Sequence, residues 1–325
     1  MAKNYNLSKD YQFNIDVSAD TYAGKLALPY VTAAVKSPDT VAKGYVRQID
    51  GLNKSANISG LSLNDPIAAA HCSFVSNDIS LAQTMQVLTL TDMKVNQNVC
   101  RNTVFPTWIG ENMDRNGNLP TSFSDFLLAT IAAKAGAQIE DMIWKGSSPF
   151  GVGFQSDDGS LDETGADASA MKDFTEVDLD GAITTADILD DLGAVYASVV
   201  ANLPGLISKP GFGFYMNQKT YSLYAQKLAS ATTFQQLGAA GDFTALTYMG
   251  FPIYVCPGMF NDTIVATYPE NLVFGTNLAT DWTEARIIPT YQYDGSDEVR
   301  VTMNFAIGVQ TAVATDGVYA TSVWT

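Results

Sequence analysis

The clearest pattern in the chain is an amphipathic one between Ser122 and Gly146. Ser122 followed by Asp125 is typical of a helix N-terminus, where both side chains meet free backbone N–H groups. Gly146 is typical of a helix end. The pattern predicts a helix of about 24 residues and roughly 36 Å, long enough to support a whole domain. Its predicted inner face consists of Phe123, Phe126, Leu127, Thr130, Ile131, Ala135, Ile139, Met142 and Ile143.

In the sequence before this helix, apolar residues recur at every second position instead of at helical spacing. Strands are predicted at 45–49 and 85–95, and an Asn- and Ser-rich stretch lies between them. We therefore expect a long β-hairpin over residues 44–96. Two strands without companions bury little surface, so the hairpin should rest on a neighbouring subunit. The residues predicted to share one face of the second strand are Met85, Val87, Thr89, Thr91, Met93 and Val95.

The remaining pattern predicts two more helices and a series of strands. One helix begins at Thr184 or Thr185 and ends at Pro204-Gly205, and another is capped by Asn217. This mixture of elements predicts the α+β class. The predicted strands are 212–216, 250–255, 272–275, 285–289, 298–306 and 308–314. Residues 1–43 predict an extended arm, and residues 147–181 an acidic loop.

The composition favours a protein that contacts partners over much of its surface. The chain is 46% hydrophobic but only 16% charged, against roughly a quarter charged in average soluble proteins. The net charge of −16 repels phosphate and argues against a nucleic-acid-binding module, although a container for DNA remains compatible with it. Residues 1–24 do not resemble a signal peptide, and the apolar patch at 126–137 is too short for a bilayer. We expect cytoplasmic synthesis and no membrane partner.

Candidate chemistry is sparse. His71 is the single histidine and has no acidic neighbours or G-x-S-x-G elbow to make a catalytic triad. The cysteines, Cys72, Cys100 and Cys256, lack C-x-x-C spacing and predict free thiols without a disulfide framework or zinc site.

Glycine-rich and acidic motifs also fall short of binding sites. Gly151-Val152-Gly153 and Gly211-Phe212-Gly213 lack the third glycine of a dinucleotide loop, and Lys145-Gly146-Ser147 has the wrong order for a phosphate loop. The runs Asp114, Asn116, Asn118 and 157–163 do not match a calcium loop, which leaves solvated loops or adventitious cation binding. We predict no catalytic, cofactor-binding or metal site.

The order of these elements resembles the major capsid proteins of tailed bacteriophages, which have the Hong Kong 97-type fold. The resemblance covers nearly the whole chain. It rests on the order of several short passages. These are Val95-Asn96-Gln97-Asn98-Val99-Cys100 with Phe105 and Trp108, Asp141-Met142-Ile143-Trp144-Lys145-Gly146, Phe214-Tyr215-Met216-Asn217 with Tyr221, Gly250-Phe251-Pro252-Ile253-Tyr254, Asn271-Leu272-Val273-Phe274-Gly275-Thr276, and 301–310.

The resemblance implies a domain organisation. The extended hairpin would overlap a neighbouring subunit, the long helix would be the spine of the peripheral domain, and axial domains would meet at fivefold and sixfold centres. The implied parts are an N-terminal arm (1–43), the extended hairpin or E-loop (44–96), the peripheral domain (97–181), the axial domain (182–270), returning peripheral strands (271–310) and a C-terminal strand (311–325), with the axial domain as its candidate location.

The same resemblance implies a structural function. The chain would assemble into hexamers and pentamers of an icosahedral head shell, built in the host bacterial cytoplasm, that encloses double-stranded DNA in the virion. A separate scaffolding protein or none, a portal and decoration proteins are the implied partners, and no cofactor or enzymatic activity is implied. Some relatives crosslink subunits through lysine and asparagine. Lys54 lies in the hairpin, but no partner asparagine or catalytic glutamate is identified, so this activity is not transferred.

Two alternatives remain open at the level of sequence. An encapsulin, a bacterial nanocompartment shell, has the same fold and encloses cargo enzymes. A cytoplasmic α+β enzyme using carboxylates, with residues 157–167 as its site, would need a pocket with perturbed pKa values. Neighbouring portal, scaffold or terminase genes would favour the phage capsid over the encapsulin. A compact monomer in size-exclusion chromatography would favour the enzyme.

Overall fold

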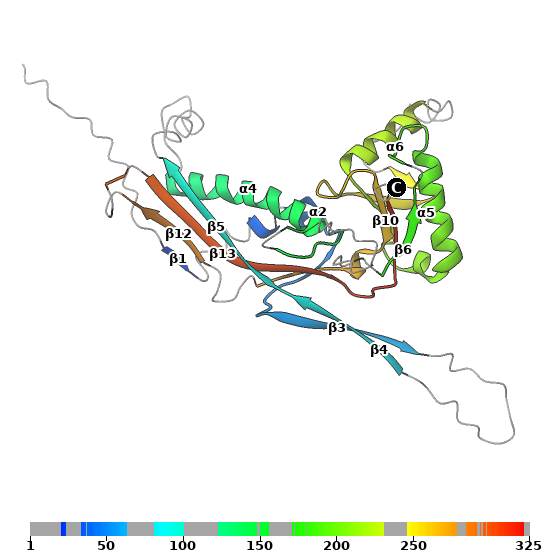
Figure 1. Cartoon of the computed structure of the whole chain (residues 1–325), viewed down its shortest axis with the longest axis horizontal. Coiled ribbons are helices and arrows are strands. Elements are labelled where there is room, and N and C mark those ends of the chain that lie inside the picture. The colour runs from blue at the N-terminus through cyan, green and yellow to red at the C-terminus, as the bar shows by residue number, and fades with distance from the viewer. Residues whose placement is uncertain are drawn as a thin grey trace, which may run out of the picture.

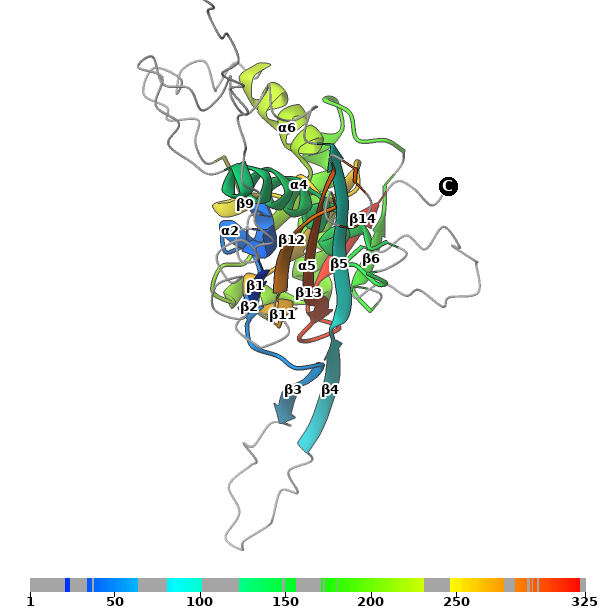
Figure 2. The same cartoon turned by 90° about the vertical axis from the view of Figure 1, so that its left-hand side faces the viewer.

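The described part of the chain folds into two six-stranded sheets and a projecting two-stranded hairpin (Figures 1 and 2). The sheets lie toward opposite ends of an elongated molecule, with the hairpin extending away from the body. The computed structural model describes residues 21–23, 34–36, 38–63, 81–100, 123–147, 150–155, 171, 173–179, 181–230, 246–277, 284–290, 293, 295–296 and 298–321. No helix in this part of the chain is long and apolar enough to cross a membrane.

The first sheet is built around the long strand β13 and packs against helix α4 (Figure 1). The strand buries every second side chain, from Val299 to Ile307, in one core with the helix. The sheet has the order β1-β12-β13-β11-β2, and β5 also pairs with β13. Its elements are β1 (Thr21–Ala23), β2 (Arg47–Ile49), β5 (Thr91–Cys100), β11 (Leu272–Thr276), β12 (Glu284–Pro289), β13 (Glu298–Thr311) and α4 (Phe123–Lys145).

The second sheet has the order β6-β14-β10-β7-β9-β8 and carries helices α5 and α6 on one face (Figure 1). Its elements are β6 (Thr175–Asp178), β7 (Gly213–Met216), β8 (Thr247–Tyr248), β9 (Phe251–Val255), β10 (Thr263–Thr267), β14 (Val318–Thr321), α5 (Ile188–Asn202) and α6 (Gln218–Ser230). Short helical turns are α2 (Asp39–Ala42), η1 (Pro204–Ser208) and η2 (Pro269–Asn271).

Both faces of the second sheet are buried, and each face belongs to a different core. On β7, Phe214 and Met216 point into the core formed with α5, whereas Tyr215 points into the core that contains α4. On β10, Ile264 points into the core formed with α5, and Val265 points into the core that contains α4. Because side chains alternate across a strand, these two strands join the cores, with the C-terminal end of α4 against the second sheet.

The long helix is confirmed, but its buried face differs in part from the prediction. Thr130 is exposed, and its hydroxyl donates to the Phe126 carbonyl at 2.9 Å. Leu128, Ala132 and Trp144 were outside the predicted face and are buried. The buried face is wider than one stripe because α4 contacts the N-terminal segment and the second sheet as well as the first.

The predicted single strand at 85–95 is wrong. The structure has β3 (Ser55–Leu63) paired with β4 (Leu81–Thr89), and then β5 in the first sheet. Leu88 and Leu90 are buried and Val87 is exposed, whereas Met93 is buried again. The buried side chains therefore move from even-numbered to odd-numbered positions between Leu90 and Met93. The predicted hairpin range of 44–96 therefore includes β2 and part of β5, which pair elsewhere. Residues 64–80 lie outside the described residues.

Three further predictions need correction. The predicted strands 298–306 and 308–314 form one strand, β13, because Gly308 continues the ladder with β11. Strand β6 lies inside the predicted loop 147–181. The described part of the predicted extended arm contains β1, paired with β12, and buried helical residues at 34–36 and in α2. Apolar side chains explain the last difference, since Ala34, Val35 and Val41 join the core beside α4.

Candidate functional site

Most residues singled out as candidate chemistry lie outside the described residues. These are His71, Cys72, Asp114, Asn116, Asn118 and the acidic run 157–167. Of the remaining cysteines, Cys100 is exposed and Cys256 is buried, and burial raises the pKa of the Cys256 thiol well above its ordinary value. Among the described residues, no group of three or more His, Cys, Asp or Glu side chains could hold a metal ion.

The glycine motifs occupy sites of close backbone packing. A Cβ atom on Gly153 would lie 2.3 Å from the Gly146 nitrogen, where the turn after α4 folds back on the helix end. A Cβ atom on Gly213 would lie 2.5 Å from the Pro252 carbonyl oxygen, between β7 and β9. Lys145 forms an ion pair with Asp141 at 3.2 Å. The motifs thus serve the packing of the chain.

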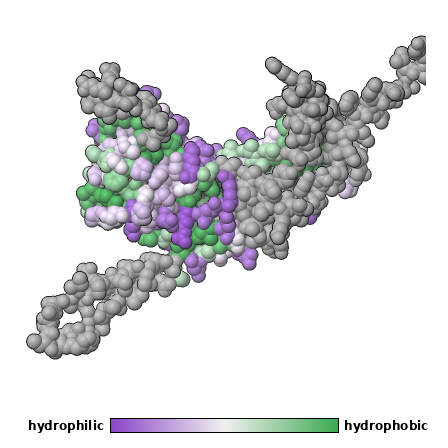
Figure 3. All heavy atoms as spheres, turned by 180° about the vertical axis from the view of Figure 1, so that it is seen from behind, coloured by the Kyte–Doolittle hydropathy of each residue, from purple (hydrophilic) through white to green (hydrophobic). Residues whose placement is uncertain are grey.

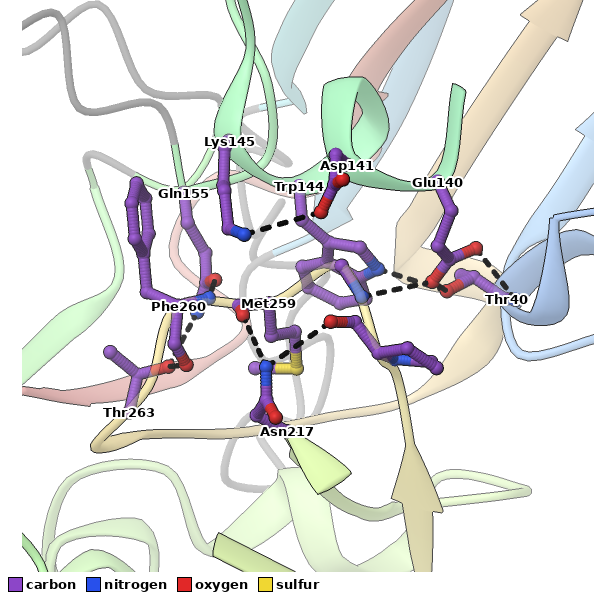
Figure 4. Close-up of polar contacts among 12 residues, drawn as sticks. Thr40, Glu140, Asp141, Trp144, Lys145, Gln155, Asn217, Met259, Phe260 and Thr263 are labelled. Carbon is purple, nitrogen blue, oxygen red and sulfur yellow. Dashed lines mark hydrogen bonds and ion pairs between the residues drawn. The ribbon is translucent and has the colours of Figure 1, made fainter. Parts of the chain in front are cut away.

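A buried polar cluster surrounds Glu140 on α4 (Figure 4). Its carboxylate accepts hydrogen bonds from the Thr40 backbone N–H at 3.0 Å and the Thr40 hydroxyl at 2.5 Å. The Gly258 N–H lies 3.5 Å from the same carboxylate. The Trp144 indole N–H donates to the Thr40 hydroxyl at 2.9 Å. One buried carboxylate therefore links α4, α2 and the loop 256–260.

Burial dominates the electrostatics of this cluster. Removal of Glu140 from water raises its pKa, while hydrogen bonds from Thr40 and Gly258 act in the opposite direction. Donors already occupy both carboxylate oxygens. This arrangement suits a structural contact between three segments rather than a general acid or base waiting for a substrate.

Asn217 and Gln155 hold the same loop from two other sides (Figure 4). Asn217 caps α6 by accepting from the Lys219 N–H at 3.0 Å, as predicted, and its amide donates to the Met259 carbonyl at 2.5 Å. The Gln155 amide donates to the Thr263 hydroxyl at 3.2 Å, and the Phe260 N–H donates to the Gln155 carbonyl at 3.0 Å. The loop is thus attached to α6 and to the turn that follows α4.

A second polar cluster surrounds Asn271, where the chain passes twice between the sheets. The Asn271 side-chain oxygen accepts from the Val313 N–H at 2.7 Å, and its amide donates to the Asp316 carbonyl at 2.9 Å. The Ala312 N–H donates to the Asn271 carbonyl at 2.8 Å. The crossing from β10 to β11 and the crossing from β13 to β14 are therefore fastened to each other.

Comparison with solved structures identifies the fold. No protein-family model and no curated protein matches the sequence. The capsid of a native GTA particle matches with a TM-score of 0.56 at 13% identity, covering 98% of this chain and 99% of that one. The capsid of Myoviridae phage XM1 matches with a TM-score of 0.54 at 8% identity, covering 88% and 92%. Gordonia phage Cozz gives 0.53 at 14% identity, covering 87% and 86%.

The chain has the fold of phage capsid proteins. This confirms the predicted mixed α+β fold of the Hong Kong 97 capsid type at the level of the whole chain. Within it, the β3–β4 hairpin is the described element that projects farthest from the body (Figure 2). Lys54 lies exposed before β3, and its backbone carbonyl accepts from the Leu90 N–H at 2.8 Å.

The hairpin also carries exposed apolar side chains. Met85 is 57% exposed and Val87 is 49% exposed, and they lie opposite Ser59 and Asn57. Apolar patches also mark the unit built on the second sheet (Figure 3), where Val200 and Met249 are exposed. Exposed apolar side chains on a two-stranded projection suit contact with another protein surface.

Proposed function

We propose that this chain is the major capsid protein of a tailed phage and assembles into the icosahedral head shell around double-stranded DNA. The observation that carries the proposal is the shared fold over nearly the full length of this chain and of phage capsid chains. The low charged fraction of 16% supports it, because shell subunits cover much of one another's surface. The role is structural, without a cofactor, and its location is the virion.

The proposed domain organisation follows from the two sheets. The first sheet and α4 support a peripheral domain (97–181 and 271–310), and the second sheet with α5 and α6 supports an axial domain (182–270). Strand β6 falls in the range 97–181 but pairs with β14, so it goes with the axial domain. The C-terminal strand (311–325) is assigned to the axial domain, since β14 pairs with β10 and β6. The N-terminal arm (1–43) and the E-loop (44–96) complete the assignment. Within these two segments, β1, β2 and the start of β5 pair in the first sheet, and the β3–β4 hairpin is the projecting part.

The proposed partners are other copies of the same chain. The E-loop would lie on a neighbouring subunit with Met85 and Val87 in the contact. A separate scaffolding protein, a portal and decoration proteins are proposed as further partners. The net charge of −16 makes subunits repel each other, so moderate salt should favour assembly by shortening the screening length to about 8–10 Å.

Negative-stain microscopy and light scattering of purified protein across salt concentrations test the proposal. We expect closed shells, with more assembly at moderate salt and in the presence of a scaffolding partner. A compact monomer at high protein concentration under all these conditions would contradict a capsid function and favour the enzyme alternative. Particles isolated from producing cells separate the two shell functions, since a phage head protects DNA from nuclease and an encapsulin holds a cargo protein.

A further inference from the structure

The β8–β9 hairpin at the edge of the second sheet turns through an unfavourable residue. Tyr248 pairs with Phe251, and only Met249 and Gly250 lie between them. Their φ angles are +50° and +85°, so both residues have the left-handed backbone of a type I′ turn. Glycine, asparagine and aspartate suit the first position of such a turn, whereas a methionine there is strained.

Packing within the subunit does not offset this strain. The Met249 side chain is 65% exposed, although its neighbours hold the hairpin firmly in place. The ring of Tyr248 lies 5.5 Å from the ring of Phe214, and the ring of Phe251 lies 5.0 Å from the ring of Phe212. A strained residue on a fixed base that exposes an apolar side chain to water is a feature of binding sites.

Helix α5 extends the apolar surface beside this turn. The ring of Phe251 lies 6.2 Å from the ring of Tyr196 on α5. Val200, one helical turn after Tyr196, is 46% exposed. The sequence contains no charged residue from 192 to 202, so this exposed part of α5 is uncharged. Together with Met249, the exposed side chains of this stretch form what we call the Met249 surface: Ala194, Ala197, Val200 and Ala201.

The charges around the Met249 surface favour another copy of this chain as the partner. Helix α5 has Asp190 and Asp191 in its first turn. Burial raises the pKa of Tyr248 and the charge of Asp190 acts in the same direction, so this carboxylate lies near the hairpin. An acidic rim repels nucleic acid and anionic lipid. Two copies of a chain with a net charge of −16 repel each other least where they meet through uncharged surface.

We propose that the Met249 surface binds a second copy of this chain, with Met249 as the anchor that fits into the neighbouring subunit. One methionine and four small side chains fall short of the about 800 Å² per partner that a stable pair of proteins buries. The contact therefore acts together with others in an assembly of many copies. In this respect the inference rests on the proposed function.

Met249→Asn is the direct test, because stability and assembly should change in opposite directions. Asparagine suits the left-handed position, so the melting temperature should rise by about 1–3 °C. Loss of the apolar anchor should raise the protein concentration needed for assembly by about tenfold, measured by light scattering. Met249→Leu is the matched control. It keeps an apolar side chain and the strained backbone, so it should assemble like the parent protein without gaining stability.

Ala197→Glu tests the part of the Met249 surface on α5. It adds a like charge at an exposed helical position, so it should block assembly and leave the melting temperature unchanged. Ala133→Glu, the same substitution at an exposed position of α4, is its control and should assemble normally. Equal loss of assembly in both variants would overturn the assignment of this part of α5 to the contact.

The identity of the partner is tested with a photo-crosslinking amino acid, benzoylphenylalanine, in place of Met249. Irradiation of the purified full chain under assembly conditions should give crosslinks between copies. Crosslinks to a scaffolding protein without any between copies would overturn the proposal. So would parent-like assembly of Met249→Asn, or a lower melting temperature in that variant.

These outcomes are distinct from failure of the proposed function. Closed shells that form equally well from Met249→Asn would overturn the contact and leave the capsid function in place. Open oligomers that Met249→Asn weakens would support the contact and count against a closed shell. A parent protein that stays monomeric and gives no crosslinks between copies would overturn both.

Discussion

Gly308 of β13 and Thr89 of β4 approach so closely that a Cβ atom on Gly308 would lie 2.2 Å from the Thr89 carbonyl oxygen. This contact is at the base of the hairpin. Leu88 and Leu90 are buried nearby, and a Cβ atom on Gly275 would lie 2.6 Å from a methyl carbon of Leu88. Two glycines of the first sheet thus leave room for the hairpin base and set the direction in which the hairpin leaves the body.

Gly308→Ala should displace the hairpin base. We expect a loss of about 1–3 kcal/mol in the free energy of unfolding, the usual cost of overpacking, and a reduced yield of closed shells. Urea unfolding and negative-stain microscopy measure the two effects. Gly205→Ala, which has open space around it, should change neither. If Gly308→Ala has the stability and the shell yield of the parent protein, the hairpin base can move to accommodate the added methyl group without cost.

The loss of stability caused by acidic substitutions along α4 should depend on how buried each position is rather than on its spacing in the sequence. Leu127 is 3% exposed, so Leu127→Asp should cost several kcal/mol out of a total stability of roughly 5–15 and prevent accumulation of soluble subunit. Ile131→Asp, at a half-buried position, should lower the melting temperature but leave some folded protein. Thr130→Asp is the control at an exposed position. Equal effects at all three positions would contradict the helix orientation.

The sequence predicted best those elements whose signals are local. The bounds of α4 follow from its periodicity and from Gly146, which has a φ of +70° where an L side chain would be strained. Asn217 likewise marked the start of α6. By contrast, the alternation at 85–95 could not show that the buried face changes at Leu88 and Leu90. That change depends on Gly275 and Gly308, about 200 residues away in the sequence.

The buried polar clusters were not predicted, for the same reason. Glu140 meets Thr40, which is 100 positions away, and Asn271 meets Val313, which is 42 positions away. One local signal for Glu140 existed. It lies beside Ile139 and one helical turn before Trp144, so a charged residue stood within the buried face and needed a partner. The identity of that partner depends on how the segments pack.

The exposed hairpin residues should matter for assembly and not for folding. Met85→Asp with Val87→Asp places charges on side chains that are about half exposed, so the melting temperature should change by less than about 2 °C, as is usual for surface substitutions. Light scattering should show loss of assembly, because the charges would be buried against the neighbouring subunit. Asn96→Asp, at an exposed position on β5, is the control and should assemble normally. Normal assembly of the double variant would show that this face of the hairpin does not contact the neighbouring subunit.

The buried carboxylate of Glu140 predicts a pH dependence of stability with a definite sign. Burial raises its pKa in the folded chain above the ordinary value of 4.5, so the folded state binds this proton more tightly than the unfolded state. The stabilisation from the protonated group is complete below pH 4.5 and is lost as the pH rises through the folded-state pKa.

Glu140→Gln resembles the protonated group and cannot titrate, while every other ionisable group remains the same in both proteins. The free energy of unfolding of Glu140→Gln minus that of the parent protein should therefore increase as the pH is raised from 4.5 to 8, whatever its value at low pH. Urea unfolding of both proteins across this range measures the difference, and subtraction removes the pH dependence that the two proteins share. A difference that falls with rising pH would show that the hydrogen bonds from Thr40 outweigh the cost of burial. A constant difference would mean that the carboxylate is as well solvated in the folded chain as in the unfolded one.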